Sequence, residues 1–240
     1  MDALPLLLSR LQFAFTISFH IIFPSFSIGL AAWLTVLEAL HLTTGRPAYR
    51  VVFEFWLKIF GVAFGLGVVS GIVMAFQFGT NWSVLSRMSG PIQGPLLSYE
   101  TFTAFALEAS FFGVLIFGRA RVPPWFYWFS TATVAFGTAL SAFWITTNNS
   151  WMQAPVGYVM ANGAFVPDDW TKIIFNRVVW VRFPHMLLAV PDGRLLCCGD
   201  RGLVPAAREV QRRSTHYAEY GPWARCGAGP HPDFLWTSHR

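Results

Sequence analysis

Two histidines lie inside apolar stretches of this chain, where an ionisable side chain is costly. His20 is the only titratable residue between positions 11 and 37, and His185 lies in a shorter apolar segment, 173–190. An imidazole in such a stretch needs a partner, and the candidates are a metal, a haem or a proton. His20 is therefore the first candidate for a functional residue. His185 fits the role of a ligand and that of an interface residue equally well.

Two glutamates form the second candidate group. Glu100 and Glu108 lie eight residues apart in one apolar stretch, which is about 80° around an α-helix. Both side chains can therefore face one side of a helix bundle. Carboxylates at membrane depth are expensive, and a pair of them commonly marks a path for protons or ions.

The elements that must position these residues are four apolar stretches, at residues 11–37, 55–78, 96–117 and 125–146. Each is near or above the roughly 20 residues that a membrane-spanning helix needs. The segment 173–190 is interrupted by two arginines and stops at a proline, so it predicts an incomplete fifth helix. The predicted fold class is therefore an all-α integral membrane protein, with four transmembrane helices and an incomplete fifth in a bundle.

Glycines and loops refine this picture. The second stretch carries small residues at helical spacing, which allow a neighbouring helix to approach closely. They are Gly61, Gly65, Gly67 and Gly71. Gly and Pro residues also indicate a loop at 41–50 and a turn-rich loop at 79–95.

The composition supports a membrane location. Hydrophobic residues make up 54% of the chain and charged residues 12%, about half the charged share of a soluble domain. The net charge of +5 does not indicate nucleic acid, because the basic residues lie in short loops and after residue 190. Loops 41–50 and 118–122 carry most of the basic loop residues, so the positive-inside rule places them in the cytoplasm and the N-terminus outside. We expect a multi-pass protein in contact with membrane lipid.

The composition changes abruptly after residue 189. Residues 190–240 are rich in Arg, Gly and Pro, contain all three cysteines and show no helical or strand periodicity. We expect a transmembrane bundle over 1–189 and an aberrant, disordered tail over 190–240. The abrupt change favours a shifted reading frame over a soluble tail.

Five segments of the chain resemble subunit I of the cytochrome bd quinol oxidases in wording, order and spacing. They are SRLQFAFTISFHIIFPSFSIGLA (9–31), FEFWLKIFGVAFGLGVVSGIVMAFQFGTNWS (53–83), ETFTAFALEASFFGVLIFG (100–118), LSAFWITTNNSWMQAPVGY (140–158) and VRFPH (181–185). The FHIIFP wording resembles the cyanide-insensitive branch of that family. The resemblance covers about residues 5–189.

The resemblance implies an enzyme of the bacterial cytoplasmic (inner) membrane that oxidises quinol and reduces dioxygen to water with protons from the cytoplasm. Its cofactors would be a low-spin haem b, a high-spin haem b and a third haem, either haem d or a further haem b. Its protein partner would be a second membrane subunit, subunit II.

The resemblance also implies roles for single residues. His20 matches the axial ligand of a high-spin haem, and His185 matches one axial ligand of the low-spin haem b. The positions that match the family's proton route are Glu100, Glu108, Lys58, Ser141 and Asn149. By sequence pattern alone, Lys58 also fits a side chain that snorkels to the membrane surface, and Asn149 a helix cap.

Two other readings remain open. Family members continue through further spans that hold a Met ligand of the low-spin haem and a quinol-binding loop, so we expect this chain alone not to oxidise quinol. It would then be a non-catalytic truncated remnant. The other alternative is a proton-coupled membrane carrier in which Glu100 and Glu108 bind cations, and it predicts no haem spectrum.

Overall fold

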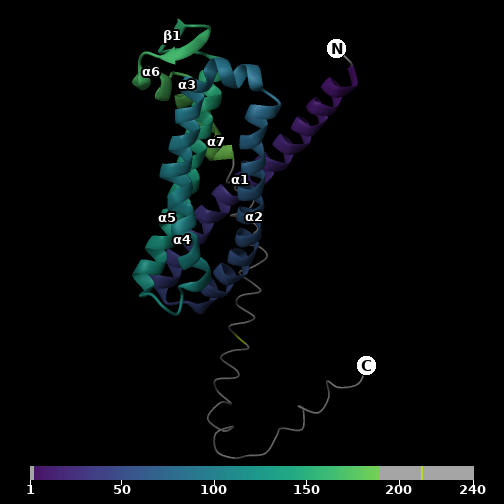
Figure 1. Ribbon diagram of the computed structural model, residues 1–240. Helices are drawn as coiled ribbons and strands as arrows, with labels where there is room; N and C mark the ends of the chain where they lie inside the picture. The colour runs from purple at the N-terminus through teal and green to yellow at the C-terminus, as the bar shows by residue number, and fades with distance from the viewer. Residues whose placement is uncertain (1–2, 190–211, 213–240) are drawn as a thin grey trace, which may run out of the picture.

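Long helices dominate the computed structural model, which describes residues 3–189 and Arg212. The elements in chain order are α1 (Ala3–Thr44), α2 (Pro47–Thr80), α3 (Ser83–Tyr99), η1 (Glu100–Phe105), α4 (Ala106–Phe117), α5 (Pro124–Gln153), β1 (Tyr158–Ala161), β2 (Ala164–Pro167), α6 (Trp170–Ile174) and α7 (Val179–Ala189). In Figure 1, α2, α4 and α5 stand side by side and α1 runs obliquely past them. The predicted tail over 190–240 lies outside the described residues, apart from Arg212.

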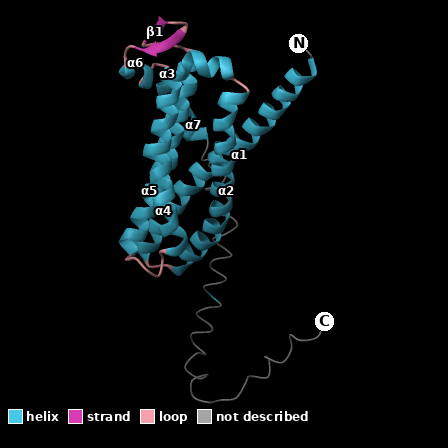
Figure 2. Cartoon of the chain, in the orientation of Figure 1, coloured by secondary structure: helices cyan, strands magenta, loops and turns pink. Residues whose placement is uncertain are grey.

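The two ends of the bundle differ in their connections. Residues 45–46 and 118–123 join helices at one end, which we call the arginine end because it carries Arg46 and Arg119. The strands and α6 cover the opposite end, which we call the hairpin end (Figure 2). The N-terminal part of α1 extends away from the bundle at the hairpin end (Figure 1).

The prediction of four membrane-spanning helices is confirmed within the described part of the chain. The helical stretches at 4–44, 47–80, 83–117 and 124–153 are long and apolar enough to cross a bilayer. Each is longer than the apolar run from which it was predicted. The loop expected over 41–50 is therefore reduced to residues 45–46, where Gly45 has a φ of +67°.

The prediction of a turn-rich loop over 79–95 is wrong for most of these residues. Helix α3 begins at Ser83 and continues through Pro91 and Pro95. Each proline removes one backbone hydrogen bond of the helix. Ile92 and Leu96 are fully buried against α5 and α6, and this burial outweighs the lost bonds.

A second departure from sequence expectation is the helix type between the two glutamates. Residues Glu100–Phe105 form a π-helix that joins α3 to α4 without a break. Short π segments inside α-helices are rare and occur often at functional sites. The wider turn changes the angle between Glu100 and Glu108 from the value that an α-helix would give.

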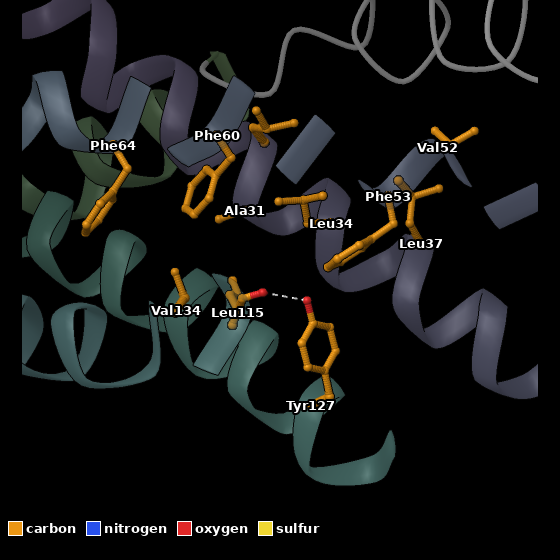
Figure 3. Packing of buried hydrophobic residues seen from close by; sticks show 11 residues of the cluster. Ala31, Leu34, Leu37, Val52, Phe53, Phe60, Phe64, Leu115, Tyr127 and Val134 are labelled. Carbon is orange, nitrogen blue, oxygen red and sulfur yellow. Dashed lines mark hydrogen bonds between the residues drawn. The ribbon is translucent and has the colours of Figure 1, made fainter. Parts of the chain in front are cut away.

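Two hydrophobic cores hold the helices together. The first lies towards the arginine end and joins α1, α2, α4 and α5 through residues such as Leu34, Phe53 and Phe60, which Figure 3 shows with their neighbours. In this core the hydroxyl of Tyr127 donates a hydrogen bond of 2.8 Å to the carbonyl oxygen of Leu115. The second core lies at the hairpin end and contains Ile92, Leu96, Trp151 and Ile173.

Short polar contacts organise the hairpin end. Strands β1 and β2 pair antiparallel around Asn162 and Gly163, which both have positive φ angles, as a two-residue hairpin turn requires. Asp169 caps α6 by accepting a hydrogen bond from the backbone N–H of Lys172. Asn176 accepts hydrogen bonds from the backbone N–H groups of Val178 and Val179, where α7 (Val179–Ala189) begins. The predicted incomplete fifth helix is thus two short helices, α6 and α7.

Candidate functional site

His20 lies where α1 packs against α2. Its Nδ1 atom is 2.9 Å from the hydroxyl oxygen of Ser70, and its ring is half-buried. A Cβ atom added to Gly71 would lie 3.3 Å from Cε1 of His20, and one added to Gly67 would lie 3.7 Å from Pro24. These two glycines therefore give the imidazole and the proline room beside α2.

The hydrogen bonds around Ser70 favour one tautomer of His20. The Ser70 hydroxyl oxygen lies 2.8 and 3.0 Å from the backbone carbonyl oxygens of Leu66 and Gly67, to which it can donate its one proton. With the proton given to these carbonyls, the oxygen accepts from His20. Nδ1 then carries the imidazole proton, and Nε2 keeps a lone pair that is available to a metal ion.

The two glutamates both face α5, as their spacing predicts. Ser141 donates a hydrogen bond of 2.7 Å to Oε1 of Glu100. Glu108 is 6% exposed and lies against Gly137, where an added Cβ atom would be 2.8 Å from Cγ of Glu108. The carboxylate pair therefore lies along one helix seam, between η1 and α4 on one side and α5 on the other.

The π segment between the glutamates is fixed by an aromatic contact. The indole N–H of Trp144 donates a hydrogen bond of 2.9 Å to the hydroxyl of Thr103, inside the π segment. The Trp144 ring also stacks on Tyr99, with ring centroids 5.5 Å apart. Trp144 thereby contacts the chain on both sides of Glu100.

The structure does not bring the remaining predicted residues to this seam. Lys58 is exposed on the outward face of α2, between Phe55 and Val62, which are 49% and 66% exposed. Oδ1 of Asn149 accepts a hydrogen bond of 2.6 Å from Arg182 of α7, whereas the hydrogen bond to Glu100 comes from Ser141. Of the five predicted proton-route residues, only Glu100, Glu108 and Ser141 are grouped together.

His185 lies on α7, and its side chain is exposed. Helix α7 is fixed to α5 by the bond between Arg182 and Asn149 and by a contact of 3.6 Å from the Thr146 hydroxyl to Sδ of Met186. Within residues 3–189, no hydrogen bond or ion pair links His185 to His20 or to the glutamates. The two histidines are therefore separate candidate ligands and not one site.

One buried ion pair was not predicted from the sequence. Arg119 donates to both carboxylate oxygens of Glu38, at 2.6 and 3.2 Å, and Glu38 is 1% exposed. The guanidinium lies 4.8 Å from the ring centre of Phe53 and 4.2 Å from that of Tyr127. Burial opposes the charge of Arg119, but the hydrogen bonds to Glu38 and the nearby charges raise its pKa above the ordinary value. Neither residue lies in a motif, so sequence gave no signal for this cluster.

The residues around His20 fit a haem. The contact with Ser70 favours the tautomer with Nε2 unprotonated, which is the form that binds iron. In many metal sites the second nitrogen of a ligating histidine is oriented by a hydrogen bond of this kind. His185 fits through donor chemistry alone, since its exposed ring has no hydrogen bond within residues 3–189. No cluster of three or more metal-binding side chains occurs in the described part of the chain.

The fold and these residues define a class: a helical membrane protein that carries an intramembrane histidine with a free nitrogen and a seam of two carboxylates. Residues 8–191 match the family model described as cytochrome bd terminal oxidase subunit I. The chain belongs to this family.

Curated relatives agree with this assignment. The chain is 40% identical over 195 residues to the cytochrome bd ubiquinol oxidase subunit 1 of Bacillus subtilis (strain 168), which covers 81% of this chain and 42% of that protein. It is 40% identical over 184 residues to the cytochrome bd-II ubiquinol oxidase subunit 1 of Escherichia coli (strain K12), which covers 76% of this chain and 36% of that protein. The chain thus spans about two fifths of the length of these relatives.

A solved structure supports the fold. The bd oxidase from Geobacillus thermodenitrificans matches with a TM-score of 0.71 and 26% sequence identity, over 78% of this chain and 43% of that one. The helical bundle described above is therefore the arrangement seen in that oxidase.

Proposed function

We propose that this chain forms the N-terminal part of a quinol-oxidising, oxygen-reducing subunit I, in which it holds a haem and supplies protons to it. The hydrogen bond between His20 and Ser70 carries the proposal. It leaves one imidazole nitrogen unprotonated inside a helix that is long and apolar enough to cross a membrane. A carrier of cations would not need that arrangement.

His20 would hold the iron of a high-spin haem through Nε2. A haem bound there supplies the site at which dioxygen accepts electrons. The chain's own contribution is to orient the imidazole ring of His20. Ser70 fixes the rotation of the ring through its hydrogen bond, and Gly71 leaves space for the ring. His185 would help to hold the low-spin haem b, and the third haem would be haem d or a further haem b.

The carboxylate seam would hold and pass protons. Glu100 accepts a hydrogen bond from Ser141, so one of its oxygens is oriented while the other stays available. Glu108 is buried further towards the arginine end, on the continuation of the helix that carries Glu100. Protons that enter from the cytoplasm would therefore pass from Glu108 to Glu100, since reduction of dioxygen in a dry site needs buried ionisable groups.

Lys58 and Asn149 belong to the proposed route only at its ends. Lys58 lies nearer to the arginine end of α2 and would attract or release protons at that membrane surface. Asn149 lies in the last turns of α5, at the hairpin end, and is oriented by Arg182. The assembly would also need subunit II, and it would lie in the bacterial inner membrane with the hairpin end and the N-terminus outside.

Haem binding by the purified chain tests this proposal. We expect the chain, produced in bacterial membranes, to carry haem that the His20→Ala variant loses. The matched control is His41→Ala, because His41 lies at the arginine end and its hydrogen bond in the described part of the chain is to the backbone carbonyl oxygen of Arg46. Equal haem content in the His20→Ala variant and the unchanged chain would contradict the proposal, and a chain without any haem would favour the carrier. The expectation that the chain alone does not oxidise quinol is tested in the same preparation.

A further inference from the structure

The seam of the two glutamates continues towards the hairpin end through two buried amide side chains. Gln93 is 3% exposed on α3, and Asn148 is 3% exposed on α5. Within residues 3–189, neither the side-chain nitrogen nor the side-chain oxygen of Gln93 has a hydrogen-bond partner, and Oδ1 of Asn148 has none either. Such buried polar atoms are nearly always satisfied, by protein or by bound water.

The helix registers place these amides on the faces that carry the seam. Gln93 precedes Glu100 by seven residues, or two turns, so both lie on one side of α3 and η1. Asn148 follows Ser141 by seven residues and lies on the same side of α5. Because Ser141 bonds Glu100 and the two helices run antiparallel, Gln93 and Asn148 face the same seam, about 10 Å beyond that bond.

Contacts on either side of the two amides support their placement in one seam between α3 and α5. Tyr99 stacks on Trp144 on the side of Glu100. Ile92 and Trp151 share the core at the hairpin end. Gln93 lies between these two contacts along α3, and Asn148 lies between them along α5. The two helices are therefore packed together on either side of the amides.

We propose that Gln93 and Asn148 bind water in the seam between α3 and α5, and that this water connects Glu100 with the aqueous surface at the hairpin end. Amides suit this task because each donates and accepts hydrogen bonds but holds no titratable proton. Within the proposed function, on which this use of the seam rests, the passage releases the water that dioxygen reduction forms. Water binding itself requires neither haem nor turnover.

Radiolytic footprinting of the full chain in lipid nanodiscs tests the proposal. An X-ray pulse produces hydroxyl radicals from bound water, and mass spectrometry measures the oxidation of neighbouring side chains. The probe is Leu96, which lies between Gln93 and Glu100 and is 0% exposed. The matched control is Leu34, which is also 0% exposed but lies in the apolar core towards the arginine end.

We expect Leu96 to be oxidised at least about tenfold faster than Leu34, since only polar cavities hold ordered water. In the Gln93→Leu variant, the rate at Leu96 should fall to that of Leu34. Equal rates at the two leucines of the unchanged chain would overturn the proposal, and so would a rate at Leu96 that Gln93→Leu leaves unchanged. The first comparison needs no variant and no haem, so its result is separate from that of the haem-binding test.

Discussion

The hydroxyl oxygen of Ser70 lies 2.9 Å from Nδ1 of His20 and joins the first two helices of the bundle at the proposed haem ligand. Ser70 is 6% exposed, so water does not compete for this bond. In the proposed function, the serine would therefore act on a bound haem through the orientation of the histidine, without touching the haem.

The first prediction concerns this bond. We expect Ser70→Ala to weaken haem binding by the chain about 10- to 100-fold, the usual cost of removing a hydrogen bond behind a metal ligand. Spectrophotometric haem titration of the purified chain measures the change. Ser98→Ala is the matched control, because the Ser98 hydroxyl bonds the carbonyl oxygen of Gly94 in the same i to i−4 manner but contacts no histidine. Unchanged affinity in Ser70→Ala would show that the bond does not orient His20.

The second prediction concerns the close packing of α5 on Glu108. A Cβ atom at Gly137 would lie 2.8 Å from Cγ of Glu108 and 3.4 Å from the carbonyl oxygen of Ala104. We expect Gly137→Ala to destabilise the chain by about 1–3 kcal/mol, because the two helices must move apart. Thermal unfolding followed by circular dichroism measures this effect.

Gly113→Ala is the control for that substitution. Gly113 also lies in a helix, but an added Cβ atom would meet nothing within 4 Å. The control should therefore leave stability unchanged or raise it by up to about 1 kcal/mol, through the better helix propensity of alanine. If Gly137→Ala behaved like Gly113→Ala, the packing of α5 on Glu108 would be looser than described.

The sequence predicted the membrane helices well because their apolar runs exceed the length that a bilayer requires. It also placed Glu100 and Glu108 on one side of the bundle, since residues about 80° apart around a helix can face the same neighbouring helix. The role of each site residue stays a prediction that the tests above address.

Other features depend on tertiary contacts that no local pattern reveals. Pro91 and Pro95 indicated a loop, but burial of Ile92 and Leu96 makes the segment helical. The π segment at Glu100 follows from contacts with Trp144, which is 44 residues away in the chain. Likewise, the glycines predicted to allow close helix approach divide by direction: Gly67 and Gly71 face α1, Gly61 faces α4, and Gly65 faces open space.

The third prediction concerns the buried ion pair at the arginine end. Arg119 links α1, α2 and α5 through Glu38, Phe53 and Tyr127. We expect Arg119→Ala to destabilise the chain by about 3–5 kcal/mol, because removal of one partner leaves a buried carboxylate without its counter-charge. Thermal unfolding measures this loss.

Arg50→Ala provides the comparison for Arg119→Ala. Arg50 forms an i,i+4 ion pair with Glu54 on the surface of α2, and both side chains are about half exposed. Pairs of this kind contribute only about 0.3–0.5 kcal/mol. Equal effects of the two substitutions would mean that the Arg119 pair is solvated and does not hold the helices together.

The last prediction concerns the pH dependence of the hairpin end. The backbone N–H of Lys172 donates to Asp169, its ammonium group lies 3.1 Å from the other carboxylate oxygen, and both contacts lower the pKa of Asp169. Because the pKa is lower in the folded state, the cap stabilises α6 above the ordinary aspartate pKa. This contribution is lost as the pH falls through the lowered pKa. Hydrogen exchange of the Lys172 amide, corrected for its intrinsic rate, should therefore accelerate in acid.

The control for this prediction is Asp169→Asn. This substitution keeps a capping oxygen but does not titrate, and it retains the neighbouring Asp168. The variant should show no such acceleration, and identical pH profiles for the two proteins would assign the effect to another group.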